Sequence, residues 1–172
     1  MSATAQELVQ FVRGLRQVRE FTPEPVSEEA LHDILEIGRW SGSGGNKQPA
    51  EVVVVRHRDL NRKLREWGAN PAGDAAATFV IASRNERPGV DEGRLAERLM
   101  LGAHALGLGA AIATLKESGP SEAKKALGVP DHLYTQVVVT IGHIDRVARR
   151  GREKRPGPPR KPMAEFAHWD RY

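Results

Sequence analysis

A chain of 172 residues with 40% hydrophobic and 28% charged residues has the size and composition of one globular domain with its own buried core. No apolar run approaches the roughly 18 residues that a membrane-spanning helix needs, and the N-terminal residues do not resemble a secretory signal. The absence of cysteine excludes disulfides, thiol nucleophiles and thiolate metal sites, and it favours a reducing, cytoplasmic location.

The net charge of +4 comes from one segment near the C-terminus. Residues 146–161 hold eight Lys or Arg and one Glu, whereas the other residues hold 18 basic and 21 acidic side chains. Such a segment can neutralise nucleic-acid phosphates, but nucleic-acid binders usually interleave aromatic residues or carry a recognisable motif, and this segment has neither. A solvated arm is therefore the favoured interpretation, with nucleic-acid binding as the alternative.

The first part of the chain predicts two helices, a loop and a strand. Apolar residues recur at helical spacing after Ala3, and Ser27 is expected to cap a second helix with two acidic residues in its first turn. Ser, Gly and Asn residues predict a loop over 41–46, and the β-branched run over 52–55 predicts a strand.

The rest of the chain continues to alternate helices with strands. The expected elements are a polar helix over 58–66, a strand over 78–82, a helix capped by Asp91, a strand over 110–114, a helix capped by Ser121 and a strand over 137–141. The longest of these helices is expected to end at Gly107 and to present one apolar face, formed by Leu95, Leu99, Met100, Ala103 and Leu106.

The predicted strands are continuous apolar runs, so both faces of their sheet should be covered by helices. This pattern indicates a mixed α/β fold of about four strands. Residues 1–144 are expected to form one domain. The basic segment over 145–172 is too polar for that core, so it should lie in solvent or reach a partner subunit.

Several familiar catalytic motifs are absent from the sequence. Gly107-Leu108-Gly109 lacks the third glycine of a dinucleotide fingerprint, and the glycines near position 44 lack the Gly-Lys-Ser/Thr end of a P-loop. There is no G-x-S-x-G elbow, and the six histidines form no paired zinc motif. Any chemistry would therefore come from a bound cofactor, and no metal site is expected.

Two polar segments suggest where such a cofactor could bind. Arg16 and Arg19 are three residues apart at a helix end, and planar guanidinium groups suit a phosphate. The Ser/Gly/Asn loop over 41–49 would let backbone groups approach a flat ligand. Taken alone, each segment also fits a plainer interpretation, as a solvated helix end and a simple connector.

Together the two segments resemble the nitroreductase family of flavoenzymes. That family has an R-x-S-V-R-x-F segment, then S-x-x-N-x-Q-P-W entering a strand, and later a D-x-G-x-A helix that ends in G-L-G. The matching stretches in this chain are Arg16 to Phe21, Ser43 to Pro49, Asp91 to Gly109, and near the end Arg160-Lys161-Pro162. The resemblance runs in order from about residue 8 to residue 170.

The resemblance implies an α+β (α/β) fold, with a central, mostly antiparallel sheet of about four to five strands flanked by helices. It also implies a homodimer that binds FMN at its interface, with the C-terminal arm reaching the partner subunit. The implied activity is transfer of hydride from NADH or NADPH to the flavin and of electrons to a small acceptor, such as a nitroaromatic or a quinone, in ping-pong order. No side-chain acid or base is needed.

The resemblance also implies roles for individual residues. Arg16 would bind the FMN phosphate together with Arg160 or Lys161, and Arg19 would lie near the pyrimidine edge of the flavin. The loop after Ser43 would contact the flavin of the partner subunit, and backbone N–H groups over 112–115 would approach flavin N5 and O4. The full implied set is Arg16, Gln17, Arg19, Ser43, Gly44, Asn46, Gln48, Ile112, Ala113, Thr114, Leu115, Arg160 and Lys161.

Two positions depart from the family pattern. Gln17 replaces the usual Ser, which puts one phosphate or ribityl contact in doubt, and Ala50 replaces the Trp that follows Gln-Pro, which leaves room beside the loop. These departures support an alternative hypothesis, a flavin-binding protein of the same fold that acts as a carrier or accessory domain without turnover.

Overall fold

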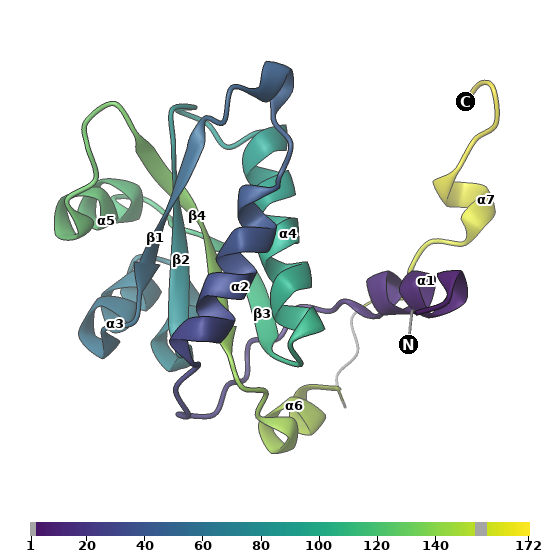
Figure 1. Ribbon diagram of the computed structural model, residues 1–172, viewed down its shortest axis with the longest axis horizontal. Coiled ribbons are helices and arrows are strands. Elements are labelled where there is room, and N and C mark those ends of the chain that lie inside the picture. Colours follow the sequence, from purple (N-terminus) through teal and green to yellow (C-terminus); the bar gives the residue numbers. More distant parts are fainter. Residues whose placement is uncertain (1–2, 154–157) are drawn as a thin grey trace.

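Four antiparallel strands form the centre of the computed structural model, which describes residues 3–153 and 158–172 (Figure 1). The order across the sheet is β1-β2-β4-β3, with Val53 opposite Val80 and Val139 between Phe79 and Ile112. The strands are β1 (Ala50–Val55), β2 (Ala77–Ser83), β3 (Gly109–Thr114) and β4 (Tyr134–Gly142). The expected mixed fold with a mostly antiparallel sheet is confirmed.

Helices cover both faces of this sheet. The α-helices are α1 (Ala5–Gly14), α2 (Glu28–Arg39), α3 (Arg58–Glu66), α4 (Val90–Ala105), α5 (Gly119–Leu127), α6 (Arg146–Glu153) and α7 (Met163–Phe166). Two short 3-10 helices are η1 (Gly44–Asn46) and η2 (Asn70–Asp74). In Figure 1, α2 and α4 lie on one face of the sheet, and α3 and α5 lie on the other.

The central strand β2 shows why the strands carry no alternating pattern. All seven of its residues are buried. Phe79 and Ile81 pack into the cluster beneath α2 and α4, whereas Val80 packs into the cluster beneath α3 and α5. Since each face of the strand meets a helical layer, apolar residues are favoured at every position, as the sequence predicted.

Helices α4 and α5 begin at different residues from those that the sequence predicted. Asp91 lies inside the first turn of α4, whose N-cap is Gly89. Ser121 lies inside α5, which begins after Ser118 with Gly119-Pro120. Proline suits the first helical turn because its missing N–H has no intrahelical partner there.

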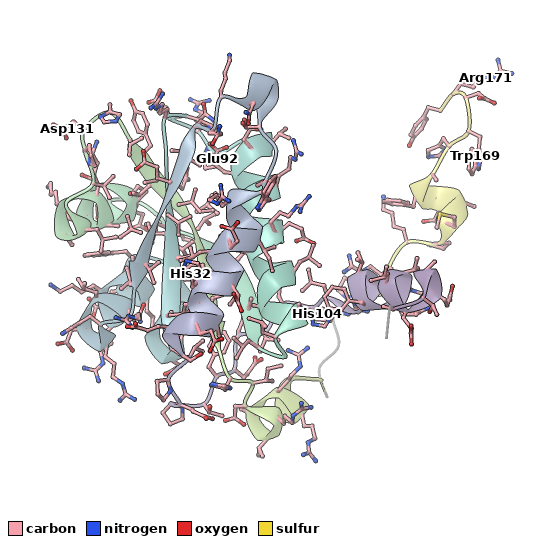
Figure 2. The ribbon with its side chains drawn as sticks, viewed as in Figure 1. His32, Glu92, His104, Asp131, Trp169 and Arg171 are labelled. Atoms are coloured by element: carbon pink, nitrogen blue, oxygen red, sulfur yellow. The ribbon has the colours of Figure 1, made fainter. Side chains whose placement is uncertain are left out.

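The first helix and the end of the C-terminal arm leave apolar side chains uncovered. No residue of α1 is buried, and Leu8, Val9 and Val12 on its apolar side are more than half exposed. On the arm, Phe166 is 73% exposed and Trp169 is 87% exposed. Both helices, α1 and α7, lie beyond the same side of the sheet, and Trp169 stands clear of it (Figure 2).

The start of the basic segment is attached to the rest of the molecule through α6. The Asp145 N–H donates to the Glu20 carbonyl at 3.0 Å, and Arg149 donates to the Gln17 carbonyl at 3.2 Å. Part of the predicted basic arm, residues 154–157, lies outside the described residues. Across the described ranges, no helix is both long and apolar enough to cross a bilayer.

Candidate functional site

The segment that carries Arg16 and Arg19 runs along the β3 edge of the sheet. The Val18 N–H donates to the Ala110 carbonyl at 2.8 Å, and Phe21 forms an antiparallel bridge with Ile144. Through these bonds the segment forms a short, irregular extension of the sheet. The segment is therefore held by backbone bonds that do not depend on its arginine side chains.

Two glycines provide the space for the buried anchors of this segment. Gly109 and Gly142 lie opposite each other in the β3–β4 register. A Cβ at Gly109 would lie 2.7 Å from Val18, and a Cβ at Gly142 would lie 2.8 Å from Phe21. Because Val18 and Phe21 fill this space, the intervening polar side chains are turned outward.

An open groove of about 730 Å³ lies beside this segment, between the end of α1, helix α4 and strand β3. Five residues of the predicted set line it: Arg16, Gln17, Arg19, Ile112 and Arg160. They come from three regions far apart in the sequence. The structure thus brings together the two arginines of the helix end and one residue of the basic arm.

The groove has an excess of positive charge. Arg13, Arg16, Arg19 and Arg160 line it, with Glu97 as its one acidic residue. Within the described part of the chain, none of the four arginines lies within 4.0 Å of a carboxylate. Their charges therefore remain available to an anionic ligand.

Hydrogen bonds orient two of these guanidinium groups. One Arg16 nitrogen donates to the carbonyls of Arg13 at 2.7 Å and Leu15 at 2.8 Å, where α1 ends. Arg19 donates to the Gln17 side-chain oxygen at 2.9 Å. Since each guanidinium has five N–H donors, both keep donors for a ligand.

Strand β3 presents only some of the predicted residues to the groove. The Leu115 N–H is bound to the Gln136 carbonyl at 2.8 Å, and the Leu115 side chain is buried on the α3/α5 face. Because alternate residues of an antiparallel strand direct their backbone groups to the same side, Ala113 also faces β4. The backbone N–H groups of Ile112 and Thr114 point to the open edge. The N–H groups of Ala113 and Leu115 therefore do not face the groove of this protomer.

The loop residues of the predicted set do not line this groove. Ser43 and Gln48 line a different pocket, between α2, β1 and α4, and Gly44 and Asn46 are exposed in η1. Lys161 is also exposed and does not line the groove. The groove of one protomer thus gathers five of the thirteen predicted residues.

The loop nevertheless has a defined shape. Ser43 Oγ accepts a hydrogen bond from the Gln48 N–H at 2.8 Å. Asn46 and Gln48 adopt positive φ angles of 54° and 47°, a conformation that costs free energy in residues other than glycine. An exposed loop held in this conformation is suited to contact a partner.

Comparison with known proteins relates part of the chain to one family. A family model described as "Nitroreductase family" matches residues 12–89, which include the arginine segment and the loop. Over this segment the chain resembles the nitroreductase family. The FMN reductase [NAD(P)H] of Bacillus subtilis is 25% identical over 193 residues, which cover 96% of this chain and 74% of that protein.

Solved structures show the same fold over nearly the whole chain. The FMN-dependent nitroreductase of Clostridium difficile R20291 superposes with a TM-score of 0.76 at 19% identity, covering 95% of this chain and 99% of that one. Nitroreductase A of Vibrio parahaemolyticus gives a TM-score of 0.78 at 23% identity, covering 95% and 75%.

Six residues that line the groove were not in the predicted set: Val12, Arg13, Leu15, Gly93, Glu97 and Met100. Arg13 lies one helical turn before Arg16, so the spacing of the arginines could have found it. Gly93, Glu97 and Met100 recur at helical spacing along α4, next to the core stripe through Leu95. No motif marks that second stripe.

A buried carboxylate fixes the start of α4, the helix that forms one wall of the groove. Glu92 is 2% exposed, and it accepts hydrogen bonds from the Ser83 hydroxyl, from the Asn85 side chain at 2.7 Å and from the Gly89 N–H at 2.8 Å. Burial by itself would raise the pKa of Glu92, but the bonds donated by Ser83, Gly89 and Asn85 outweigh it and hold the pKa below its ordinary value.

Replacing Glu92 with Gln should lower the free energy of unfolding at pH 7 by about 1–3 kcal/mol, because bonds to a buried charge are lost. A carboxylate with a depressed pKa stabilises the fold above its unfolded pKa, and this stabilisation is lost as the pH falls through the folded value. The difference in stability between the two proteins should therefore shrink as the pH falls below the ordinary range of a glutamate, through the depressed pKa of Glu92. Urea unfolding at pH 7 and at low pH, with Glu86→Gln as an exposed control in the same loop, measures both effects.

Proposed function

We propose that this protein is an FMN-dependent oxidoreductase that takes hydride from NADH or NADPH and passes electrons to a small acceptor. The observation that carries the proposal is the groove in which four arginines that form no ion pair with a described residue meet the open edge of β3. The names of the relatives, an FMN reductase [NAD(P)H] and an NADPH-flavin oxidoreductase, support the same cofactor pair.

The groove has residues suited to each end of FMN, the phosphate and the flat ring. Arg16 and Arg160 would bind the phosphate, since guanidinium groups donate paired hydrogen bonds to phosphate oxygens. Leu15, Met100 and Ile112 give the groove apolar surface for the flat ring. The outward N–H groups of Ile112 and Thr114 would donate to polar atoms of the ring.

When bound, FMN would supply the redox chemistry, accepting hydride from the nicotinamide and reducing a nitroaromatic, quinone or similar acceptor in ping-pong order. Arg19 would hold a positive charge near the ring edge, which favours the reduced state electrostatically. The Gln17 side chain orients Arg19. No side-chain acid or base is required.

We further propose that the protein works as a homodimer. The loop that carries Gly44 and Asn46 does not line the groove of its own protomer, so it would complete the groove of a partner. The uncovered apolar faces of α1 and of the arm around Trp169 would be buried in the same assembly. The exposed arm thereby acquires a role in dimer contact, with one of its cations, Arg160, in the groove.

The visible absorption of the purified protein tests the cofactor, and reduction tests the enzyme. We expect a yellow protein, or a colourless one that becomes yellow with added FMN. Anaerobic stopped-flow mixing with NADH or NADPH should bleach the flavin, and an aromatic acceptor should restore its colour. A protein that takes up no FMN would end the proposal. Bound flavin that neither nucleotide bleaches would instead identify a flavin carrier.

A further inference from the structure

Beyond this function, we propose that a second pocket binds a neutral, two-ring aromatic molecule. The pocket lies beneath the loop over 41–49, between the C-terminal half of α2, the start of β1 and the N-terminal half of α4. Its volume is about 260 Å³. None of its lining residues lines the arginine groove, so it is a separate site on the protomer.

The walls of this loop pocket are mainly apolar. Leu35, Leu95 and Leu99 from the two helices face Ala50 and Val52 from β1. Ala50 is too small to fill the space between the helices and the strand. An apolar cavity of roughly 150 Å³ holds one benzene ring, so the loop pocket has room for two fused rings.

One polar atom of a residue that lines the pocket lacks a partner among the described residues. The hydroxyl oxygen of Ser41 is buried, and no described residue forms a hydrogen bond with it. A buried hydroxyl without a partner is unfavourable, and a polar substituent on a ligand ring would supply the missing bond. The ligand should therefore carry one hydroxyl, carbonyl or ring N–H.

The charges around the pocket favour a neutral ligand. The Arg39 guanidinium donates two hydrogen bonds of 2.7 Å to Glu36, which largely satisfies its charge. Glu51 and Asp91 place two further carboxylates among the lining residues. An anion would be repelled here, whereas the arginine groove attracts one. The two sites thus select ligands of different charge.

Titration of the full-length protein with 2-naphthol, followed by the backbone amide signals in NMR, tests the site directly. We expect shifts at Gly38, Ser41 and Gly42 and none around Arg16. Ala50→Trp should fill the space and lower the affinity by on the order of tenfold or more. The control Ala105→Trp, at an exposed position of α4, should leave the affinity unchanged.

A second variant removes the hydroxyl of Ser41 and changes the volume of the pocket only slightly. It therefore tests the proposed hydrogen bond separately from the shape of the pocket. Ser41→Ala should weaken 2-naphthol by roughly three- to tenfold, because one hydrogen bond is lost. The same variant should leave the affinity for 2-methylnaphthalene unchanged. Equal losses for both probes would show that Ser41 contributes only to the shape of the pocket and would overturn the assignment.

Two further outcomes would overturn the proposal. Displacement of 2-naphthol by saturating FMN would make the loop pocket part of the flavin site. Shifts of the pocket signals in Trp169→Ala without any probe would show that the arm of a second copy already fills the space. Binding that persists in both the FMN-free and the FMN-loaded protein supports the site, whether or not the protein turns over.

Discussion

Replacing Arg16 with Ala is expected to weaken FMN binding by roughly 10- to 150-fold, the range for one lost hydrogen-bonded ion contact. Arg16 lines the groove, forms no ion pair with a described carboxylate, and is oriented by two carbonyls at the end of α1. A phosphate placed there would lose a charged, paired donor. Flavin fluorescence during titration of the FMN-free protein measures the dissociation constant.

The backbone of the arginine segment should survive this change, because the Val18 and Phe21 anchors hold it. The melting temperature without FMN should therefore remain close to that of the unmodified protein. Arg58→Ala is a matched control, since Arg58 is an exposed arginine on α3, outside the groove. Equal FMN affinity in the two variants would remove Arg16 from the phosphate site.

Periodicity and composition predicted most elements because their signals are local. The β-branched run at 52–55 and the polar helix over 58–66 follow from residues close in sequence, and both occur in the structure. The start of α4 could not be predicted from such a local signal. Asp91 is a good cap by residue type, but Glu92 binds back to the Gly89 N–H, which sets the cap two residues earlier. A buried carboxylate satisfied by three donors cannot be read from spacing alone.

The order of the strands depends on contacts between distant residues. Continuous apolar runs show that both sheet faces are covered, but they do not distinguish antiparallel from parallel pairing. The family resemblance supplied that part. The same limit applies to β3, where Ile112 and Leu115 look equivalent in sequence, yet backbone pairing to β4 turns only one of them to the groove.

There is a physical reason why one protomer gathers only part of the predicted residue set in the groove. Arg16 and Arg160 meet because the arginine segment and the arm both pass the β3 edge of their own chain. The loop around Gly44 lies against a different face of α4, because the pocket beneath the loop is lined by Asp91, Leu95 and Leu99 of that helix, whereas the groove is lined by Gly93, Glu97 and Met100. The part in the flavin site that we propose for this loop therefore requires a second copy.

A designed heterodimer tests that dependence. Gly44→Glu should be tolerated by its own protomer, because a Cβ there meets no atom within 4 Å and the residue has no positive φ. In a dimer, the added carboxylate would enter the partner's groove, occupy space meant for the flavin and repel its phosphate. We expect the Gly44→Glu homodimer to lose at least about tenfold in FMN affinity. Gly44→Ala, which adds only a methyl group, should bind FMN nearly normally.

Combining Gly44→Glu with Arg16→Ala in separate subunits distinguishes a loop that acts on the partner from one that acts on its own groove. In the heterodimer, isolated with two affinity tags, one groove would receive both defects. The other would pair an intact Arg16 with an intact loop. If the loop crosses the interface, the heterodimer should bind about one FMN per dimer with the affinity of the unmodified protein. If the loop served its own protomer, each groove would carry one defect, and no tight site would form. Isothermal titration of the purified heterodimer separates these results, because the number of tight sites is measured independently of their affinity.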